Sequence, residues 1–212
     1  MPLKVDKLST GSLSVNGTEI NKNGGLPYKV YTALLTQSGG DDTSGENGGT
    51  AVGNYPELII GRTYNITDNF QLESDFTNVG APNNNVGTYF VATGTTPASW
   101  GTYALLQYNT GAPVVTVLEN TIGNIWFNYL EVGRYEINLS NSIEIDKTFL
   151  YIGNGPTVNQ LVYFEEVGIK TITFYGLLGS ESKLMIYSSL DGYSSFADGK
   201  CNKTPIEIRV YN

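Results

Sequence analysis

Alternation of apolar and polar residues is the feature that most constrains how this 212-residue chain can fold. It occurs in three segments of the last third, at 135–139, 171–174 and 206–210. Successive side chains of a β-strand point to opposite faces of a sheet, so each segment predicts a half-buried strand with its apolar side inward. Helical periodicity is almost absent, and turn residues recur at the roughly 8- to 12-residue spacing of sandwiches and barrels. We therefore predict an all-β fold, an antiparallel β-sandwich of the jelly-roll or immunoglobulin type.

Residues 1–25 read as a segment separate from the rest of the chain. The stretch LSVNGTEI, from Leu13 to Ile20, has an Asn-Gly pair at its centre, which favours a tight turn between two antiparallel strands. A hairpin of two strands is only marginally stable alone. We expect either a frayed terminus or a segment that attaches to another part of the chain, to a second copy or to a larger assembly. Leu13, Val15 and Ile20 are the candidate attachment residues.

The middle of the chain alternates short strand signals with polar turns. Residues 28–36 predict a clear strand. Residues 38–54 are rich in Gly, Ser, Asp and Asn, so they cannot bury apolar area and are expected to be an exposed, mobile loop. Shorter strands are expected around 58–60, 63–66, 87–92 and 103–108.

The charge balance and the missing residue types exclude several classes of function. Without histidine there is no Ser-His-Asp triad, no Cys-His pair and no imidazole metal site. Cys201, the single cysteine, cannot form an intrachain disulfide or a thiolate zinc cage. The net charge of −8 argues against nucleic acid and anionic membranes as partners. We see no apolar run of the roughly 20 residues that a spanning helix needs, and no secretory signal.

The acidic residues do not form a convincing catalytic or metal site. The adjacent or nearly adjacent carboxylates lie in polar, turn-like settings where such groups are usually just solvated; they are the pairs Asp41 and Asp42, Glu73 and Asp75, and Glu165 and Glu166. Calcium ligands are conceivable at Asp41, Asp42 and Glu46, but their spacing does not match a calcium-binding loop. We therefore expect no catalytic residue, no bound metal and no cofactor, and we do not expect an enzyme.

The aromatic residues are more informative. Trp100 lies in a loop-like stretch, TTPASWG, close to Tyr103. An exposed tryptophan on a loop can stack on a sugar ring or anchor an interface. The alternative is that Trp100 folds back as a lid on the core. Trp100 and Tyr103 are therefore the candidate residues for a glycan site or an interface.

Three strings of residues resemble a β-domain that recurs in tailed phages of Bacteroidetes, including crAss-like phages. They are YKVYTALLTQSG at 28–39, APVVTVLENTIG at 112–123 and NKTPIEIRVY at 202–211. In that family the first two strings are almost adjacent, whereas about 70 residues separate them here. Within the added stretch, residues 75–85 and 90–100 resemble segments of phage structural proteins. The resemblance thus implies one sandwich over 26–212 with an insertion at about 41–110, preceded by an attachment segment at 1–25.

The resemblance also implies a function by assembly. The expected protein is a virion structural protein, a head or tail fibre or a capsid decoration protein, made in the host cytoplasm and located on the virion. Its expected partners are further copies of itself, as a homotrimer, and other capsid or tail proteins. An alternative is a module that binds host surface glycan during adsorption, and a third, less favoured reading is a capsule-degrading enzyme. The family strings carry packing and turn residues, and no active site is implied by them.

Overall fold

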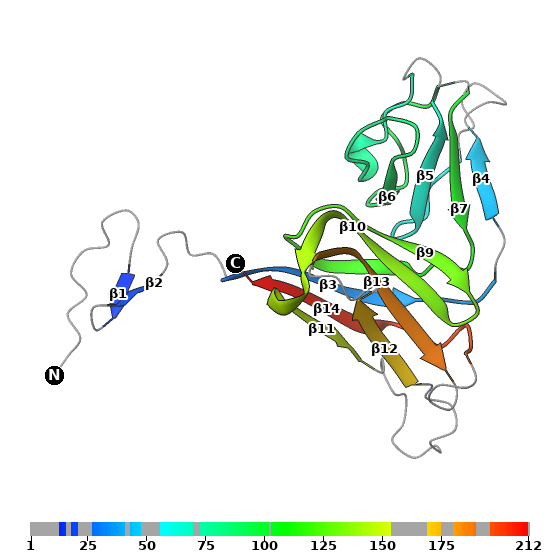
Figure 1. Ribbon diagram of the computed structural model, residues 1–212. Coiled ribbons are helices and arrows are strands. Elements are labelled where there is room, and N and C mark those ends of the chain that lie inside the picture. Colours follow the sequence, from blue (N-terminus) through cyan, green and yellow to red (C-terminus); the bar gives the residue numbers. More distant parts are fainter. Residues whose placement is uncertain are drawn as a thin grey trace.

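The computed structural model confirms the all-β fold (Figure 1). The structure describes residues 13–15, 18–20, 27–40, 43–47, 56–69, 73–101, 103–153, 169–174, 180–189 and 196–211. Over these ranges the regular elements are β-strands and two short 3₁₀ turns, η2 (Thr77–Val79) and η3 (Ile145–Lys147), with no α-helix. All strand pairs are antiparallel.

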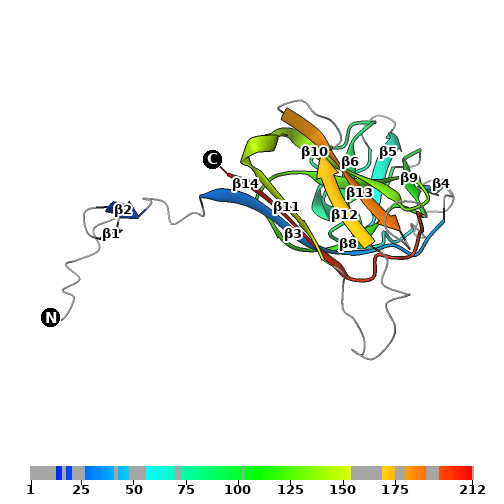
Figure 2. The same cartoon turned by 60° about the horizontal axis from the view of Figure 1, so that its bottom comes forward.

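Two four-stranded sheets form the sandwich. The first has the order β12-β13-β10-β9 and consists of β9 (Ile125–Glu131), β10 (Arg134–Glu144), β12 (Ile169–Phe174) and β13 (Ser180–Ser189). The second has the order β11-β14-β3-β8 and consists of β3 (Tyr28–Thr36), β8 (Val114–Asn120), β11 (Thr148–Ile152) and β14 (Thr204–Tyr211). Figure 2 shows β11, β14 and β3 of the second sheet side by side.

The inward-facing residues of the two sheets make one core, as the alternation predicts. Tyr135, Ile137 and Leu139 on β10 are buried, and so are Ile206 and Ile208 on β14. The expectation that 135–139 is only half buried is wrong, because Glu136 and Asn138 are buried too; Glu136 is satisfied there by Lys183 and Asn138. The side chains of 171–174 lie outside what the structure describes. Across the layers the rings of Tyr31 and Phe127 lie 6.4 Å apart. Burial of these alternating side chains, at roughly 25 cal/mol per Å² of apolar area, is what holds the two sheets together.

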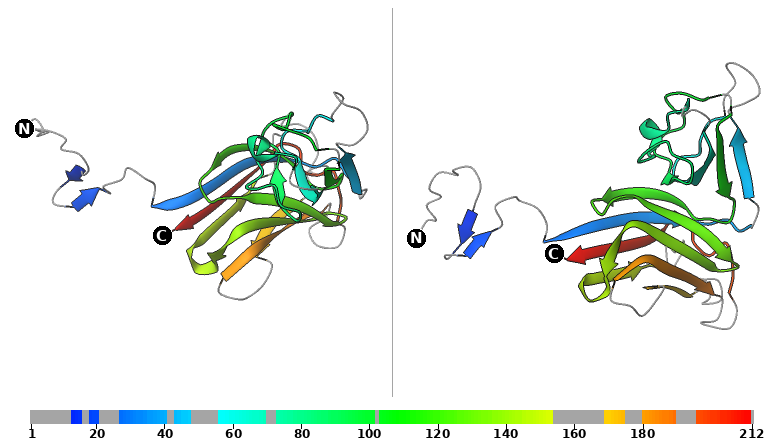
Figure 3. Two further views of the ribbon diagram at one scale, coloured as in Figure 1. Left: turned by 90° about the horizontal axis from the view of Figure 1, so that it is seen from above. Right: turned by 45° about the horizontal axis from the view of Figure 1, so that its top comes forward.

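A third sheet contains only residues between 43 and 109. Its order is β4-β7-β5-β6, from β4 (Thr43–Asn47), β5 (Thr63–Asp68), β6 (Tyr89–Val91) and β7 (Leu105–Asn109). It has a hydrophobic cluster of its own, centred on Tyr64, Phe76, Phe90 and Leu106. We call residues 41–110 the insertion. The chain enters and leaves it between β3 and β8, which pair directly with Thr36 opposite Val114, and Figure 3 shows its sheet on one side of the sandwich.

Two expectations for the insertion are wrong. Residues 43–47 belong to the stretch expected to be a loop, yet they form β4, which pairs with β7 from Thr43 opposite Asn109 to Asn47 opposite Leu105. An edge strand is held by backbone hydrogen bonds to one neighbour, so its side chains need not be apolar. Residues 58–60, expected to be a strand, form none; Leu58 is buried, whereas Ile59 and Ile60 are exposed at a turn.

The expected N-terminal hairpin is present. β1 (Leu13–Val15) and β2 (Thr18–Ile20) pair with Leu13 opposite Ile20 and Val15 opposite Thr18. They form a two-stranded sheet of their own, which lies away from the three other sheets in Figure 1. The side chains of these strands, and the turn between them, lie outside what the structure describes.

Candidate functional site

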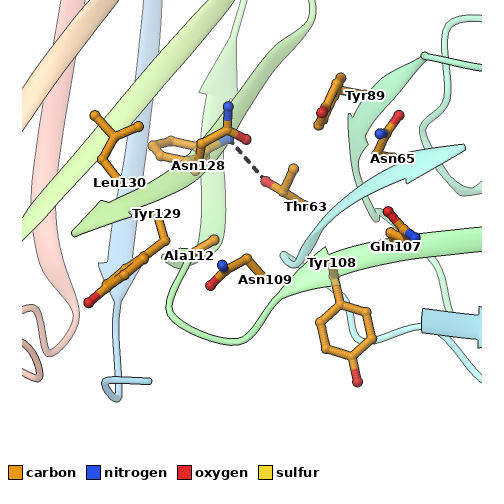
Figure 4. Close-up of a pocket in the computed structure, with 11 residues that line it drawn as sticks. Thr63, Asn65, Tyr89, Gln107, Tyr108, Asn109, Ala112, Asn128, Tyr129 and Leu130 are labelled. Atoms are coloured by element: carbon orange, nitrogen blue, oxygen red, sulfur yellow. Dashed lines mark hydrogen bonds between the residues drawn. The ribbon is translucent and has the colours of Figure 1, made fainter. Parts of the chain in front are cut away.

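A cavity of about 310 Å³ lies where the insertion meets the sandwich (Figure 4). β5, β6 and β7 contribute one side, and β9 contributes the other. Its lining residues are Thr63, Asn65, Tyr89, Gln107, Tyr108, Asn109, Ala112, Phe127, Asn128, Tyr129 and Leu130. We call it the junction cavity.

A hydrogen bond between the sandwich and a side chain of the insertion forms the floor of the junction cavity. The backbone nitrogen of Phe127 donates a hydrogen bond to Thr63 Oγ1 at 3.0 Å, drawn as a dashed line in Figure 4. Thr63, Ala112 and Phe127 are all buried. Gln107 and Leu130 are exposed. The cavity therefore has a closed floor and a rim open to solvent.

Further contacts hold the two sides of the cavity in place. Asn124 Nδ2 donates to the carbonyl oxygen of Tyr89 at 2.8 Å. The ring of Tyr89 stacks on Trp126 with centroids 5.8 Å apart and an interplanar angle of 15°. Val115 donates its backbone N–H to the carbonyl oxygen of Gly61 at 2.9 Å. These contacts fix the insertion, through Gly61 and Tyr89, against the sandwich, through Val115, Asn124 and Trp126.

Contacts with residues outside the cavity fix the positions of two tyrosines that line it. Tyr129 donates its hydroxyl to Asp198 Oδ2 at 2.9 Å. Asp198 Oδ1 accepts from Tyr135 Oη and from the backbone nitrogen of Gly133, both at 2.8 Å. Burial is the main cause that raises the pKa of Tyr135, so this hydroxyl keeps its proton and donates. The Tyr108 ring lies under the Arg62 guanidinium, 4.1 Å from the centroid.

The amides of the lining differ in their hydrogen bonding. Asn128 Nδ2 donates to Glu136 Oε2 at 3.3 Å, and Asn109 Oδ1 accepts from the backbone nitrogen of Gly111 at 2.7 Å. Asn65 Oδ1 is buried and has no hydrogen-bond partner within the described part of the chain. No lysine, arginine, aspartate or glutamate lines the cavity. The space is therefore polar through amides and hydroxyls, without charge.

A second surface feature lies on the outer side of the sheet β11-β14-β3-β8. Phe149, Tyr151 and Tyr211 are 41–48% exposed. The Tyr28 and Tyr211 rings lie 5.3 Å apart, and Arg209 lies over Tyr28 at 5.1 Å and over Phe149 at 5.6 Å. We call Tyr28, Phe149, Tyr151, Arg209 and Tyr211 the aromatic face.

Trp100 and Tyr103 do not form one site. Trp100 is only 8% exposed and packs edge-on against Phe76, with ring centroids 5.2 Å apart. Of the two alternatives for Trp100, the structure has the one in which it closes the core of the insertion. Tyr103 is 63% exposed on the same loop. A stacking platform made by Trp100 is therefore excluded.

The acidic candidates are only partly described. Asp75 Oδ1 accepts from Thr77 N, Thr77 Oγ1 and Asn84 Nδ2 at 2.7–3.1 Å. These bonds, first of all that of the Thr77 hydroxyl, lower the pKa of Asp75, and they give it a structural role in the turn. Asp41, Asp42, Glu165 and Glu166 lie outside the described residues, as does the side chain of Glu46. Among the described residues no group of His, Cys, Asp and Glu could hold a metal ion. Cys201 is buried in the sandwich core.

The attachment candidates lie together on one hairpin. Leu13 and Ile20 are directly opposite each other, and Val15 ends β1.

The junction cavity was not among the expected sites, because its residues are spread over 63–130 and none of them stands in a recognisable motif. The sequence is rich in asparagine and threonine, and this amide and hydroxyl content is the signal that could have indicated such a surface.

In comparisons with protein-family models, curated proteins and solved structures, no match to this chain was found. In the described part of the chain no helix is long and apolar enough to cross a membrane. The junction cavity and the aromatic face are thus the features from which a function can be inferred.

Proposed function

We propose that this protein is a structural component of a phage virion, of the fibre or decoration type, and that copies of it assemble through the aromatic face. The observation that most directly supports this proposal is the aromatic face, which exposes Phe149, Tyr151 and Tyr211 on one side of a sheet. Contiguous exposed apolar surface marks interaction sites. Tyrosine and arginine are also among the residues that most often dominate binding energy at interfaces.

The resemblance to phage β-domains supports the virion assignment. Its three strings contain β3, β8 and β14, which are three of the four strands of the sheet that carries the aromatic face. Residues that resemble a family of assembling proteins therefore build the surface proposed for assembly. The expected place of the protein is the virion, after synthesis in the host cytoplasm.

The charges of the aromatic face favour a second copy as its partner. Two copies of a chain with net charge −8 repel each other overall. Next to the face, however, Glu207 on the same strand forms an ion pair with Arg209, so both signs of charge lie at the aromatic face. In a cyclic homotrimer each interface is heterologous, so the aromatic face of one copy would contact a different surface of the next copy. Both signs of charge allow the face to meet acidic and basic groups on that surface. A homotrimer is the expected state.

The native mass of the purified protein, measured by light scattering after size exclusion, tests this proposal. The expected mass is near three times 23.0 kDa. The double variant Phe149→Ser/Tyr151→Ser is expected to be monomeric, because it removes the two exposed rings of β11. Val86→Ser is the matched control, since Val86 is 60% exposed in the insertion. A wild-type protein that is monomeric at high micromolar concentration, or an oligomer that survives the double variant, contradicts assembly through this face.

A second candidate function is binding of host surface glycan during adsorption. Trp100 is buried and does not support it, but the uncharged junction cavity does. Both functions can reside in one protein, because the cavity and the aromatic face lie on different sheets. Release of reducing ends from host polysaccharide by the purified protein would instead support the third, capsule-degrading alternative.

A further inference from the structure

We propose that the junction cavity binds one neutral sugar unit, held by Asn65 and Gln107 from the insertion, by Asn128 from the sandwich and by the ring of Tyr89. This inference deepens the second candidate function and is independent of assembly through the aromatic face. It names the class of ligand and the residues that contact it.

The chemistry of the lining matches sugar hydroxyls. A hydroxyl both donates and accepts hydrogen bonds, and a side-chain amide offers both an acceptor oxygen and a donor nitrogen. Asn65, Gln107 and Asn128 come from three different strands, and Figure 4 shows Asn128 on one side of the cavity and the other two across from it. A ligand between them can therefore be bonded from both sides.

Strand pairing sets the positions of the polar side chains that the insertion contributes. Asn65 on β5 lies directly opposite Gln107 on β7 and opposite Tyr89 on β6. Side chains of directly opposite residues share one face of a sheet. Asn65, Gln107 and Tyr89 therefore form one wall of the cavity.

Tyr89 gives the cavity aromatic surface that is already ordered, because its ring is stacked on Trp126. The rings of Tyr108 and Tyr129 point away from the amides in Figure 4 and pack against the cores of the insertion and the sandwich. Aromatic rings offer large apolar area to the C–H faces of a sugar. Side chains that are ordered before binding lose little entropy when the ligand arrives.

Size and charge narrow the class of ligand. A volume of about 310 Å³ is at the small end of the range for ligand sites, which suits about one or two sugar rings. The exposed rim at Gln107 and Leu130 leaves room for a longer glycan to continue into solvent. A phosphate or carboxylate would find no cationic side chain in the lining and would meet a chain of net charge −8. The favoured ligand is therefore neutral.

Saturation-transfer NMR on the full chain, with a panel of neutral and acidic sugars, tests the proposal. The neutral probes are glucose, galactose, mannose, N-acetylglucosamine, maltose and lactose; the acidic probes are glucuronic acid and glucose 6-phosphate. An array of neutral oligosaccharides extends the panel to longer glycans. At least one neutral sugar is expected to bind at millimolar concentration or below, and the acidic probes are not.

Variants then assign binding to the cavity. Asn65→Ala and Gln107→Ala are each expected to weaken binding about five- to tenfold, the effect of losing one hydrogen bond. Tyr89→Phe tests the hydroxyl while it keeps the ring on Trp126. Asn202→Ala, an exposed amide outside the cavity, is the control and should bind like the wild type. Thermal unfolding of each variant confirms that it is folded.

Three results would overturn the proposal: no neutral sugar or oligosaccharide binds, an acidic probe binds more tightly than every neutral one, or folded Asn65→Ala and Gln107→Ala bind like the control. These outcomes are separate from the test of assembly. A chain that binds no sugar can still be a trimer, and a monomer can still bind sugar.

Discussion

The backbones of Gly61 and Val115 meet at the boundary between the insertion and the sandwich. Val115 N–H donates to the Gly61 carbonyl at 2.9 Å, and a Cβ atom on Gly61 would lie 2.0 Å from the carbonyl oxygen of Val115. Gly61 also has a φ of +84°, which side chains rarely tolerate. Glycine is therefore required here for two reasons, conformation and space.

Gly61→Ala is expected to lower the free energy of unfolding by about 3–4 kcal/mol, because a strained backbone adds to an overpacked contact. Gly87→Ala is the matched control: Gly87 has a φ of +88°, and a Cβ there would meet nothing within 4 Å. In Gly87→Ala the free energy of unfolding should fall only by the cost of the strained backbone, about 1–2 kcal/mol. Denaturant unfolding measures both, and equal losses would show that the close approach to Val115 does not matter.

Removing the hydroxyl of Tyr31 and removing that of Tyr135 are expected to change the free energy of unfolding in opposite directions. Tyr31 Oη is buried without a hydrogen-bond partner in the described residues, so Tyr31→Phe should raise the free energy of unfolding by about 1 kcal/mol. Tyr135 Oη donates to Asp198 at 2.8 Å, so Tyr135→Phe should lower it by about 2 kcal/mol. Chemical denaturation of both variants measures the two changes. Effects of the same sign would contradict this assignment.

Acid is expected to remove the contribution of Asp75 to stability. Hydrogen bonds from Thr77 and Asn84 lower the pKa of Asp75 in the folded state below its ordinary value of 3.8. The bonds favour the carboxylate, so their stabilisation is complete above the unfolded-state pKa, near 4, and is lost as the pH falls through the folded-state pKa. Asp75→Asn should therefore have a lower Tm than the wild type at pH 7, with a gap that closes in acid. Thermal unfolding against pH measures the gap, and Glu73→Gln removes a nearby charge as control.

Deletion of residues 1–25 is expected to leave the sandwich folded and to abolish incorporation into virions. The reason is that β1 and β2 pair only with each other among the described strands. Circular dichroism with thermal melting tests folding, and the amount of protein bound to purified phage particles tests the proposed attachment. Deletion of residues 1–12 keeps the hairpin and should still incorporate. If the longer truncation also incorporates, attachment lies elsewhere in the chain.

Local patterns in the sequence predicted which apolar side chains of two strands face the core, although β10 is buried on both faces at 135–139. The alternation at Tyr135, Ile137 and Leu139, and again at Ile206 and Ile208, placed these residues correctly in the core. The Asn16-Gly17 pair predicted the hairpin β1-β2. Such predictions succeed because side-chain direction along a strand depends only on the backbone of that strand.

Apart from β1 and β2, the tertiary structure alone decided which strands lie next to each other. β4 has no apolar pattern and exists because β7 pairs with it. Trp100 is buried because the ring of Phe76 lies against it. Asn65, Gln107 and Asn128 enclose the junction cavity because their strands pack together. Strand pairing and packing join residues distant in sequence, so the fold class follows from the sequence, whereas the cavity follows only from how the insertion meets the sandwich.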